Sequence, residues 1–186
     1  MNRTSPIIVF VLMLGVVAGC RSDASREEEP IRRALEMEGA SQQAERVHLA
    51  ISEDGRPRLW MEADKLWRFE EDTVRVELAG EETPVQGAVF DSEGRKRATF
   101  KAGKVSYIEK EHTFILEYGV EVQTTEGQRL STERLIWNER SRQWYAPGFV
   151  RYRTKEEEMQ GYRLRADESL EHFSMAEITG QVIIRR

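Results

Sequence analysis

The stretch FILEYGVEV, residues 114–122, decides the fold. Apolar residues occupy every second position in it, at Phe114, Leu116, Tyr118, Val120 and Val122. Because side chains along a β-strand alternate between its two faces, this pattern predicts a strand with one buried face. Shorter runs with the same period occur at residues 47–51 and 74–78, and no sustained helical stripe follows residue 46. The sequence therefore predicts an all-β body.

Pairs of residues that favour tight turns separate the expected strands. They are Asp54-Gly55, Glu93-Gly94, Glu126-Gly127 and Gln160-Gly161. The glycines of successive pairs are 39, 33 and 34 residues apart, which indicates an internal repeat. Each repeat is expected to consist of a strand, a turn and a second strand.

A small residue ends the strand that follows each turn. These residues are Ala63, Ala102, Thr132 and Ala166. In the first three repeats the next apolar residue comes three positions later, at Leu66, Val105 and Leu135. An odd spacing places two residues on opposite faces of a regular strand, so we expect a bulge or corner that returns both to the inner face.

Repeats of this kind cannot bury their apolar faces alone and must stack. We expect two facing antiparallel sheets, or one long sheet folded over itself, over residues 47–186. A closed barrel is the alternative, but unequal repeat lengths favour an open β-jelly-roll over an evenly sheared barrel.

The N-terminus has the features of an export signal. Arg3 precedes an apolar run at residues 7–17, and small residues lead up to Cys20. The end of this segment resembles a bacterial lipobox, so residues 1–19 are predicted to be a lipoprotein signal peptide and Cys20 the lipid attachment site. A plain signal peptide with an incidental cysteine is the alternative. Residues 20–46 are then a polar tether, which either contains a short helix after Pro30 or is a solvated linker.

Composition excludes several classes of function. The net charge of −5 argues against nucleic acid as a partner, because phosphate binding needs a basic surface. A single cysteine excludes an intramolecular disulfide and a cysteine-cluster metal site. The sequence lacks G-x-S-x-G, phosphate-loop and H-E-x-x-H motifs, and its three histidines are far apart. We therefore expect no enzymatic activity, no cofactor and no metal ion.

Aromatic residues occur in every repeat, and two arrangements fit that distribution. They either fill the core of a sandwich or line an apolar groove between the sheets, which would suit a lipid. Periodicity does not choose between these arrangements.

Residues 126–182 resemble the LptC family, the periplasmic, inner-membrane-attached component of the lipopolysaccharide export machinery. The matching features are Gly127, Leu130, Thr132, Glu133, Leu135 and Trp137, then Val150 and Tyr152, then Gly161, Leu164, Ala166 and Asp167, then Gly180 and Val182. An earlier unit matches through Asp91, Gly94, Ala102 and Tyr107. The resemblance covers residues 47–184.

The resemblance implies a periplasmic protein that receives lipopolysaccharide from the inner-membrane ABC transporter and passes it to an LptA-like periplasmic bridge protein. Well-known members of the family are anchored in the inner membrane by a transmembrane helix, whereas a lipid anchor is expected for this chain. Arg21 is not the usual retention signal after a lipid-bearing cysteine, which leaves open the membrane that holds the anchor.

Two sets of residues follow as hypotheses. The lipopolysaccharide groove would be lined by Leu59, Met61, Phe100, Tyr107, Leu116, Tyr118, Leu130, Trp137, Tyr152 and Leu164. The edge strands that join partners would include Val47, Leu49 and Ile51 for the transporter, and Ile178, Val182 and Ile184 for the bridge protein. The alternatives are a soluble bridge or chaperone of the same superfamily, and a lipoprotein that binds glycan or protein on an aromatic surface.

Overall fold

Eleven antiparallel β-strands build the part of the chain that the computed structural model describes, residues 39–182. The strands are β1 (Ala40–Glu53), β2 (Arg56–Glu70), β3 (Val74–Ala79), β4 (Val85–Phe90), β5 (Lys96–Ala102), β6 (Lys104–Ile108), β7 (Thr113–Thr124), β8 (Arg129–Asn138), β9 (Gln143–Arg153), β10 (Glu157–Asp167) and β11 (Phe173–Val182). Within this range no helix is present, and so none that could span a membrane. The all-β prediction is confirmed.

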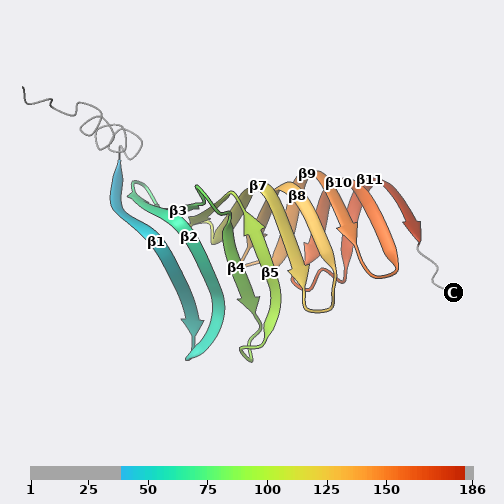
Figure 1. Ribbon diagram of the computed structural model, residues 1–186, viewed down its shortest axis with the longest axis horizontal. Helices are drawn as coiled ribbons and strands as arrows, with labels where there is room; N and C mark the ends of the chain where they lie inside the picture. The colour runs from blue at the N-terminus through green and yellow to red at the C-terminus, as the bar shows by residue number, and fades with distance from the viewer. Residues whose placement is uncertain (1–38, 183–186) are drawn as a thin grey trace, which may run out of the picture. The chain divides into compact units, whose positions relative to one another are not determined.

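The strands form one sheet that folds over itself. Its order is β11-β10-β9-β8-β7-β5-β4-β2-β3-β6, with β1 beside β2 and a further pairing between β6 and β7. The first part of β2 pairs with β4 and its last part pairs with β3. Likewise, the first part of β7 pairs with β6 and its last part pairs with β5. Two routes therefore connect β2 to β7, which we name the β4–β5 layer and the β3–β6 layer. The expected folded sheet of a β-jelly-roll is confirmed, and Figure 1 shows its strands side by side from β1 to β11.

Long strands bend where they cross from one layer to the other. The pairing of β7 with β8 shifts at one point. Glu117 pairs with Arg134 and Val120 pairs with Thr132, so β7 has one residue more than β8 between these two pairs. Tyr118 and Gly119 both have positive φ at this bulge, at 68° and 64°. The expected corner in β8 is confirmed, because Thr132 and Leu135 are both buried although they are three residues apart.

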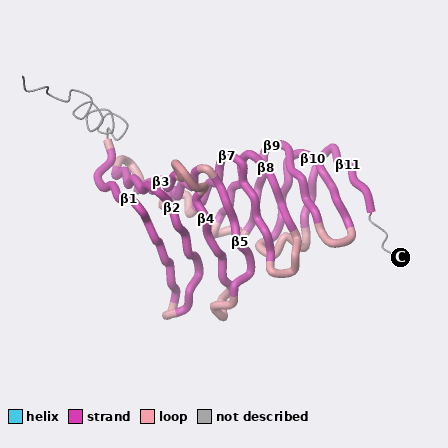
Figure 2. Tube along the Cα trace, in the orientation of Figure 1, coloured by secondary structure: helices cyan, strands magenta, loops and turns pink. Residues whose placement is uncertain are grey.

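Three of the four predicted turns connect strands, as Figure 2 shows for the loops between β1 and β2, β4 and β5, and β7 and β8. The fourth prediction is wrong, because Gln160-Gly161 lies inside β10. The turn comes earlier, where the Thr154 N–H donates to the Glu157 carbonyl at 2.8 Å. Gly161 instead allows close strand approach, since a Cβ there would lie 2.8 Å from the Ala176 carbonyl oxygen.

The first strand begins at Ala40, so it includes residues 40–46, which were expected to belong to the tether. Cys20, the predicted signal peptide, the possible helix after Pro30, and Ile184 lie outside the described residues.

Inward-facing residues align in rows across the strands. One row of the β4–β5 layer contains Phe100, Val122, Leu130, Tyr152 and Met159. The facing layer has a row of Tyr107, Phe114, Trp137, Trp144, Ala166 and Phe173. Burial of each large apolar side chain contributes about 1.5–3 kcal/mol, so these rows hold the two layers together.

Candidate functional site

A cavity of about 960 Å³ lies between the two layers. Its apolar wall comes from both of them and consists of Ile51, Leu59, Met61, Val89, Phe90, Ala98, Phe100, Val105, Phe114, Leu116, Val122, Trp137, Trp144 and Leu170. The interior is therefore hollow in this region instead of being filled throughout by side chains.

Phe100 holds its place in the cavity wall because Gly87 lies opposite it on β4. A Cβ at position 87 would lie 2.3 Å from the Phe100 ring and 2.7 Å from the Trp60 carbonyl oxygen. Only glycine leaves room for the ring at this point. The pair of Gly87 on β4 and Phe100 on β5 thus shapes this part of the cavity wall.

Tyr152 connects the strand β9 to β11 and to the loop before it. Its ring centroid lies 4.8 Å from that of Phe173, and its hydroxyl donates a hydrogen bond to the Leu170 carbonyl at 3.3 Å. Burial raises the pKa of the Tyr152 phenol, and nearby carboxylates such as Glu157 raise it further. The phenol stays neutral and continues to donate, so this contact holds Leu170, which is part of the cavity lining.

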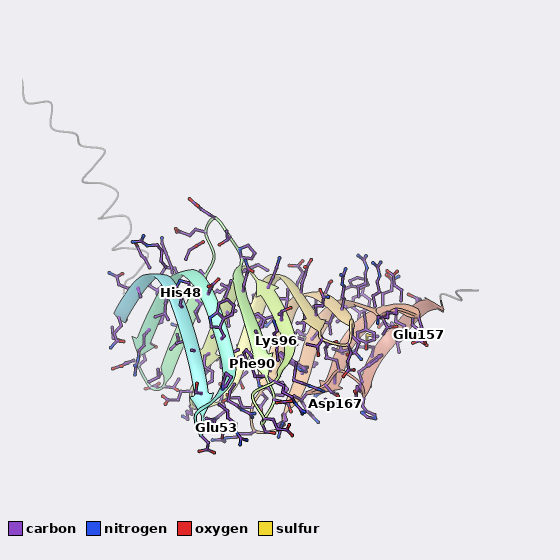
Figure 3. All side chains as sticks on the ribbon, turned by 60° about the horizontal axis from the view of Figure 1, so that its bottom comes forward. His48, Glu53, Phe90, Lys96, Glu157 and Asp167 are labelled. Atoms are coloured by element: carbon purple, nitrogen blue, oxygen red, sulfur yellow. The ribbon has the colours of Figure 1, made fainter. Side chains whose placement is uncertain are left out.

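The mouth of the cavity is charged. Its lining includes residues from turns and strand ends of both layers: Glu53, Arg58, Asp91, Arg95, Arg97, Glu126, Glu139, Arg142, Asp167 and Glu168. Figure 3, with this edge turned forward, labels Glu53, Phe90 and Asp167. Several of the charges pair with each other, including Arg58 with Glu53 at 3.1 Å and Arg142 with Glu168. An apolar interior with a polar rim suits an amphipathic ligand better than a small polar one.

Two aspartates fix the turns of the rim. The Asp91 carboxylate accepts the backbone N–H groups of Glu93 and Arg95, both at 2.9 Å, and the Arg95 hydrogen bond is the main cause of its lowered pKa. Burial alone would raise the pKa of Asp167, but hydrogen bonds from His172, Ser169 and the Glu171 backbone lower it below its usual value. Both groups are therefore ionised at neutral pH and hold the turns in one conformation.

A family model described as lipopolysaccharide-assembly, LptC-related, matches residues 7–182, nearly the whole chain. The chain belongs to the LptC family. No curated protein matches it. Membership of the LptC family assigns the chain a role in lipopolysaccharide transport, in a family of transport components that are periplasmic and associated with the inner membrane.

In this LptC-family chain, five of the ten predicted groove residues line the cavity. They are Leu59, Met61, Phe100, Leu116 and Trp137. Four others belong to the core or pack against it without lining the cavity, namely Tyr107, Leu130, Tyr152 and Leu164. The sequence pattern therefore selected inward-facing positions but did not separate the hollow part from the filled part.

Tyr118 does not line the cavity, because its side chain is 66% exposed. The extra residue in the bulge at Tyr118-Gly119 turns the side chain outward before Val120 faces inward again. Its predicted place in the groove is wrong.

Several residues of the cavity wall were not expected. Val89 and Ala98 face each other across β4 and β5, and both pack against the core. Ala98 lies two residues before Phe100, so strand alternation would have selected it, although a small side chain carries little apolar signal. Trp144 lies on β9 opposite Trp137, and Leu170 lies in the loop between β10 and β11; the alternation within one strand specifies neither position.

Among the described strands, β1 pairs only with β2, and β11 pairs only with β10. Val47 and Leu49 of β1 are half-buried against the core, whereas Ile51 is exposed near the cavity mouth. Ile178 of β11 is 51% exposed. The sheet of this LptC-family chain therefore ends in two strands that each have one unpaired edge in the described range.

Metal binding finds no support in residues 39–182, where no group of three or more His, Cys, Asp or Glu side chains could hold an ion. The three histidines in this range each lie beside one carboxylate: His48 beside Glu62, His112 beside Glu139 and His172 beside Asp167.

Proposed function

We propose that the chain is the membrane-anchored component that receives lipopolysaccharide from the inner-membrane ABC transporter and passes it to an LptA-like periplasmic bridge protein. The observation that carries the proposal is the apolar cavity between the layers, with its charged mouth. Its volume of about 960 Å³ is at the upper end of the range for ligand sites, roughly 300–1,000 Å³.

The physical need for such a cavity comes from the acyl chains. Exposure of one chain of about ten CH₂ groups to water costs on the order of 8 kcal/mol. A lipid with several chains therefore crosses an aqueous compartment only if a protein covers them. In this proposal the apolar wall takes up acyl chains, and the charged rim faces the sugar and phosphate groups.

Transfer would proceed along the sheet from one free edge to the other. A partner strand can extend an unpaired edge through backbone hydrogen bonds, which would join the interior of one jelly-roll to that of the next. We assign β1 to the transporter and β11 to the bridge protein. A lipid on Cys20, with the residues before β1 as a tether, would hold the chain at the inner membrane.

The rival function, recognition of glycan or protein by surface aromatics, has one observation in its favour. Phe149 and Tyr162 are both partly exposed and their ring centroids lie 5.5 Å apart. That function would leave the interior filled, however, and the cavity therefore favours lipid transport.

A photo-crosslinking amino acid in place of Leu59 or Trp137 should label lipopolysaccharide in cells. Both residues line the cavity from opposite layers, so a bound acyl chain would lie within reach of either. The measurement is the amount of lipopolysaccharide that migrates with the chain after irradiation. Ile115 and Ile136 are the controls, because they pair with each other on β7 and β8, and Ile136 is the neighbour of Trp137 on the opposite face of β8. Labelling from the controls alone would exclude the cavity as the lipid site.

The substitution Ile178→Lys should reduce capture of the bridge protein about tenfold and leave capture of the transporter unchanged. Lysine on an edge strand opposes pairing with another strand, and Ile178 is exposed enough to tolerate the change. Co-purification of each partner with the full chain measures the effect. Tyr162→Lys serves as the control, since Tyr162 is similarly exposed but lies on β10, which is paired on both sides. Equal losses for the two variants would contradict the assignment of β11.

A further inference from the structure

A second and smaller cavity, of about 340 Å³, lies on the outer face of the sheet. Exposed residues of β5, β7, β8 and β9 surround it: Thr99, Lys101, Glu121, Gln123, Arg129, Ser131, Arg151 and Arg153. The residues between them on the strands, Phe100, Val122 and Leu130, also line it. Their neighbours along the strands, such as Val122 and Leu130, are buried on the inner face. Phe100 and Val122 line both cavities, so the outer cavity lies across the sheet from the large one.

Strand register brings the outer side chains into two adjacent rows. One row runs from Gln123 through Arg129 to Arg153, each the direct cross-strand partner of the next. The other row runs through Glu121, Ser131 and Arg151, with Lys101 opposite Glu121. The two rows thus place four cations on one patch of the outer face, with Glu121 and Ser131 between Lys101 and Arg151.

The charge of this outer cavity is unbalanced. Four cations line it, with Glu121 as the only carboxylate among the lining residues. Arg153 is neutralised by Glu158, whose two carboxylate oxygens lie 3.0 and 2.9 Å from its Nη2. Within residues 39–182, no carboxylate lies within ion-pair distance of Lys101, Arg129 or Arg151. Three cations are therefore left to attract an anion from outside the described part of the chain.

Arg129 lies beside another cation and has no ion-pair partner of its own in residues 39–182. Arg129 and Arg153 are directly opposite each other, and like charges at such positions destabilise a sheet. Stability alone does not account for a second arginine in this place, since Arg153 already has its partner in Glu158.

We propose that this outer cavity is a binding site for phosphate groups, formed by Lys101, Arg129, Arg151 and Ser131. Guanidinium groups present paired N–H donors that match two oxygens of a phosphate, and lysine adds a point charge. The Ser131 hydroxyl and the Gln123 amide add neutral donors at the centre. The lining is too polar for an acyl chain, so the site takes the phosphate of a soluble phosphorylated molecule or of a lipid headgroup.

The test measures anion binding to the full chain in an uncharged detergent by isothermal titration calorimetry. The probes are inorganic phosphate, and detergent micelles with and without added phosphatidylglycerol. The double variant R129Q/R151Q should weaken binding at least about tenfold, since it removes two charge-assisted contacts. The double variant K110Q/R140Q removes the same charge from exposed turn residues and should change affinity less than about twofold.

Binding of inorganic phosphate supports a soluble source, and binding only to micelles with phosphatidylglycerol supports a lipid headgroup. Equal effects of the two double variants, or no binding of either probe, would overturn the proposal. A second variant, Ser131→Asp, keeps the test independent of folding defects. It places a carboxylate among the cations, so it should abolish anion binding while it raises the thermal unfolding midpoint.

Discussion

Ala98→Trp should lower the affinity for lipopolysaccharide at least about tenfold while the chain still folds. Ala98 lies on β5 in the wall of the large cavity, opposite Val89. An indole at this position would extend into space that the proposed function assigns to acyl chains. Because it fills a void instead of displacing packed side chains, the thermal unfolding midpoint should stay the same or rise.

The measurement is binding of fluorescent lipopolysaccharide to the purified full chain, with thermal unfolding recorded on the same samples. Gln86→Trp is the matched control, because Gln86 is exposed on β4, the strand that pairs with β5. It adds the same indole to the surface of the same layer. If Ala98→Trp bound lipopolysaccharide as tightly as Gln86→Trp, the large cavity would not be the lipid site.

The cavity wall shows which inward-facing residues the sequence pattern predicts correctly and which it does not. Strand alternation correctly placed Leu116 and Trp137 inside, because each belongs to a regular stretch between bulges. It failed at Tyr118, two residues further along β7. A bulge depends on the register of the neighbouring strand, here Glu117 opposite Arg134 and Val120 opposite Thr132, and one strand does not encode that register.

Prediction of turns from pairs of turn-favouring residues has a similar limit. Gln160-Gly161 resembles the pairs that do form turns, yet Gly161 serves a close contact with β11 that is distant in sequence. The start of β1 was missed for another reason. Residues 41–46 are exposed on both faces of an edge strand, so they show no alternation of polar and apolar residues.

The hollow interior was the feature that sequence could not decide. It arises because β2 and β7 each pair with two different strands, which separates the β4–β5 layer from the β3–β6 layer. Such pairings join residues that are far apart in the chain. Apolar periodicity identifies which side chains face inward, but the space between two inward faces depends on how far apart the layers lie.

The loop between β3 and β4 connects those layers, and Gly80→Ala should destabilise the chain by about 3 kcal/mol. A Cβ at position 80 would lie 1.9 Å from the Thr83 carbonyl oxygen and 2.9 Å from the Pro84 Cα. Both are backbone-defined positions, so rotation of a side chain cannot relieve the clash. The loop is also held in place, because the Gly80 N–H donates to the Gly103 carbonyl at 3.0 Å.

A single carboxylate makes this loop rigid. Asp64 of β2 accepts the backbone N–H groups of Glu81, Glu82 and Thr83 at 2.7, 3.0 and 3.3 Å. These hydrogen bonds lower the pKa of Asp64, with the Glu81 N–H as the largest cause. An alanine at position 80 would therefore have to displace a loop that is held at several points, and part of this network would break.

Urea denaturation of the full chain, followed by tryptophan fluorescence, measures the loss as a lower midpoint for Gly80→Ala. Gly148→Ala is the control, since no atom lies within 4 Å of a Cβ at that position. Its free energy of unfolding should stay within about 0.5 kcal/mol of the unmodified chain. Equal midpoints for the two variants would mean that the loop between β3 and β4 accommodates the added Cβ at little cost in free energy. The separation of the layers, and with it the volume of the large cavity, would then have to depend on other contacts.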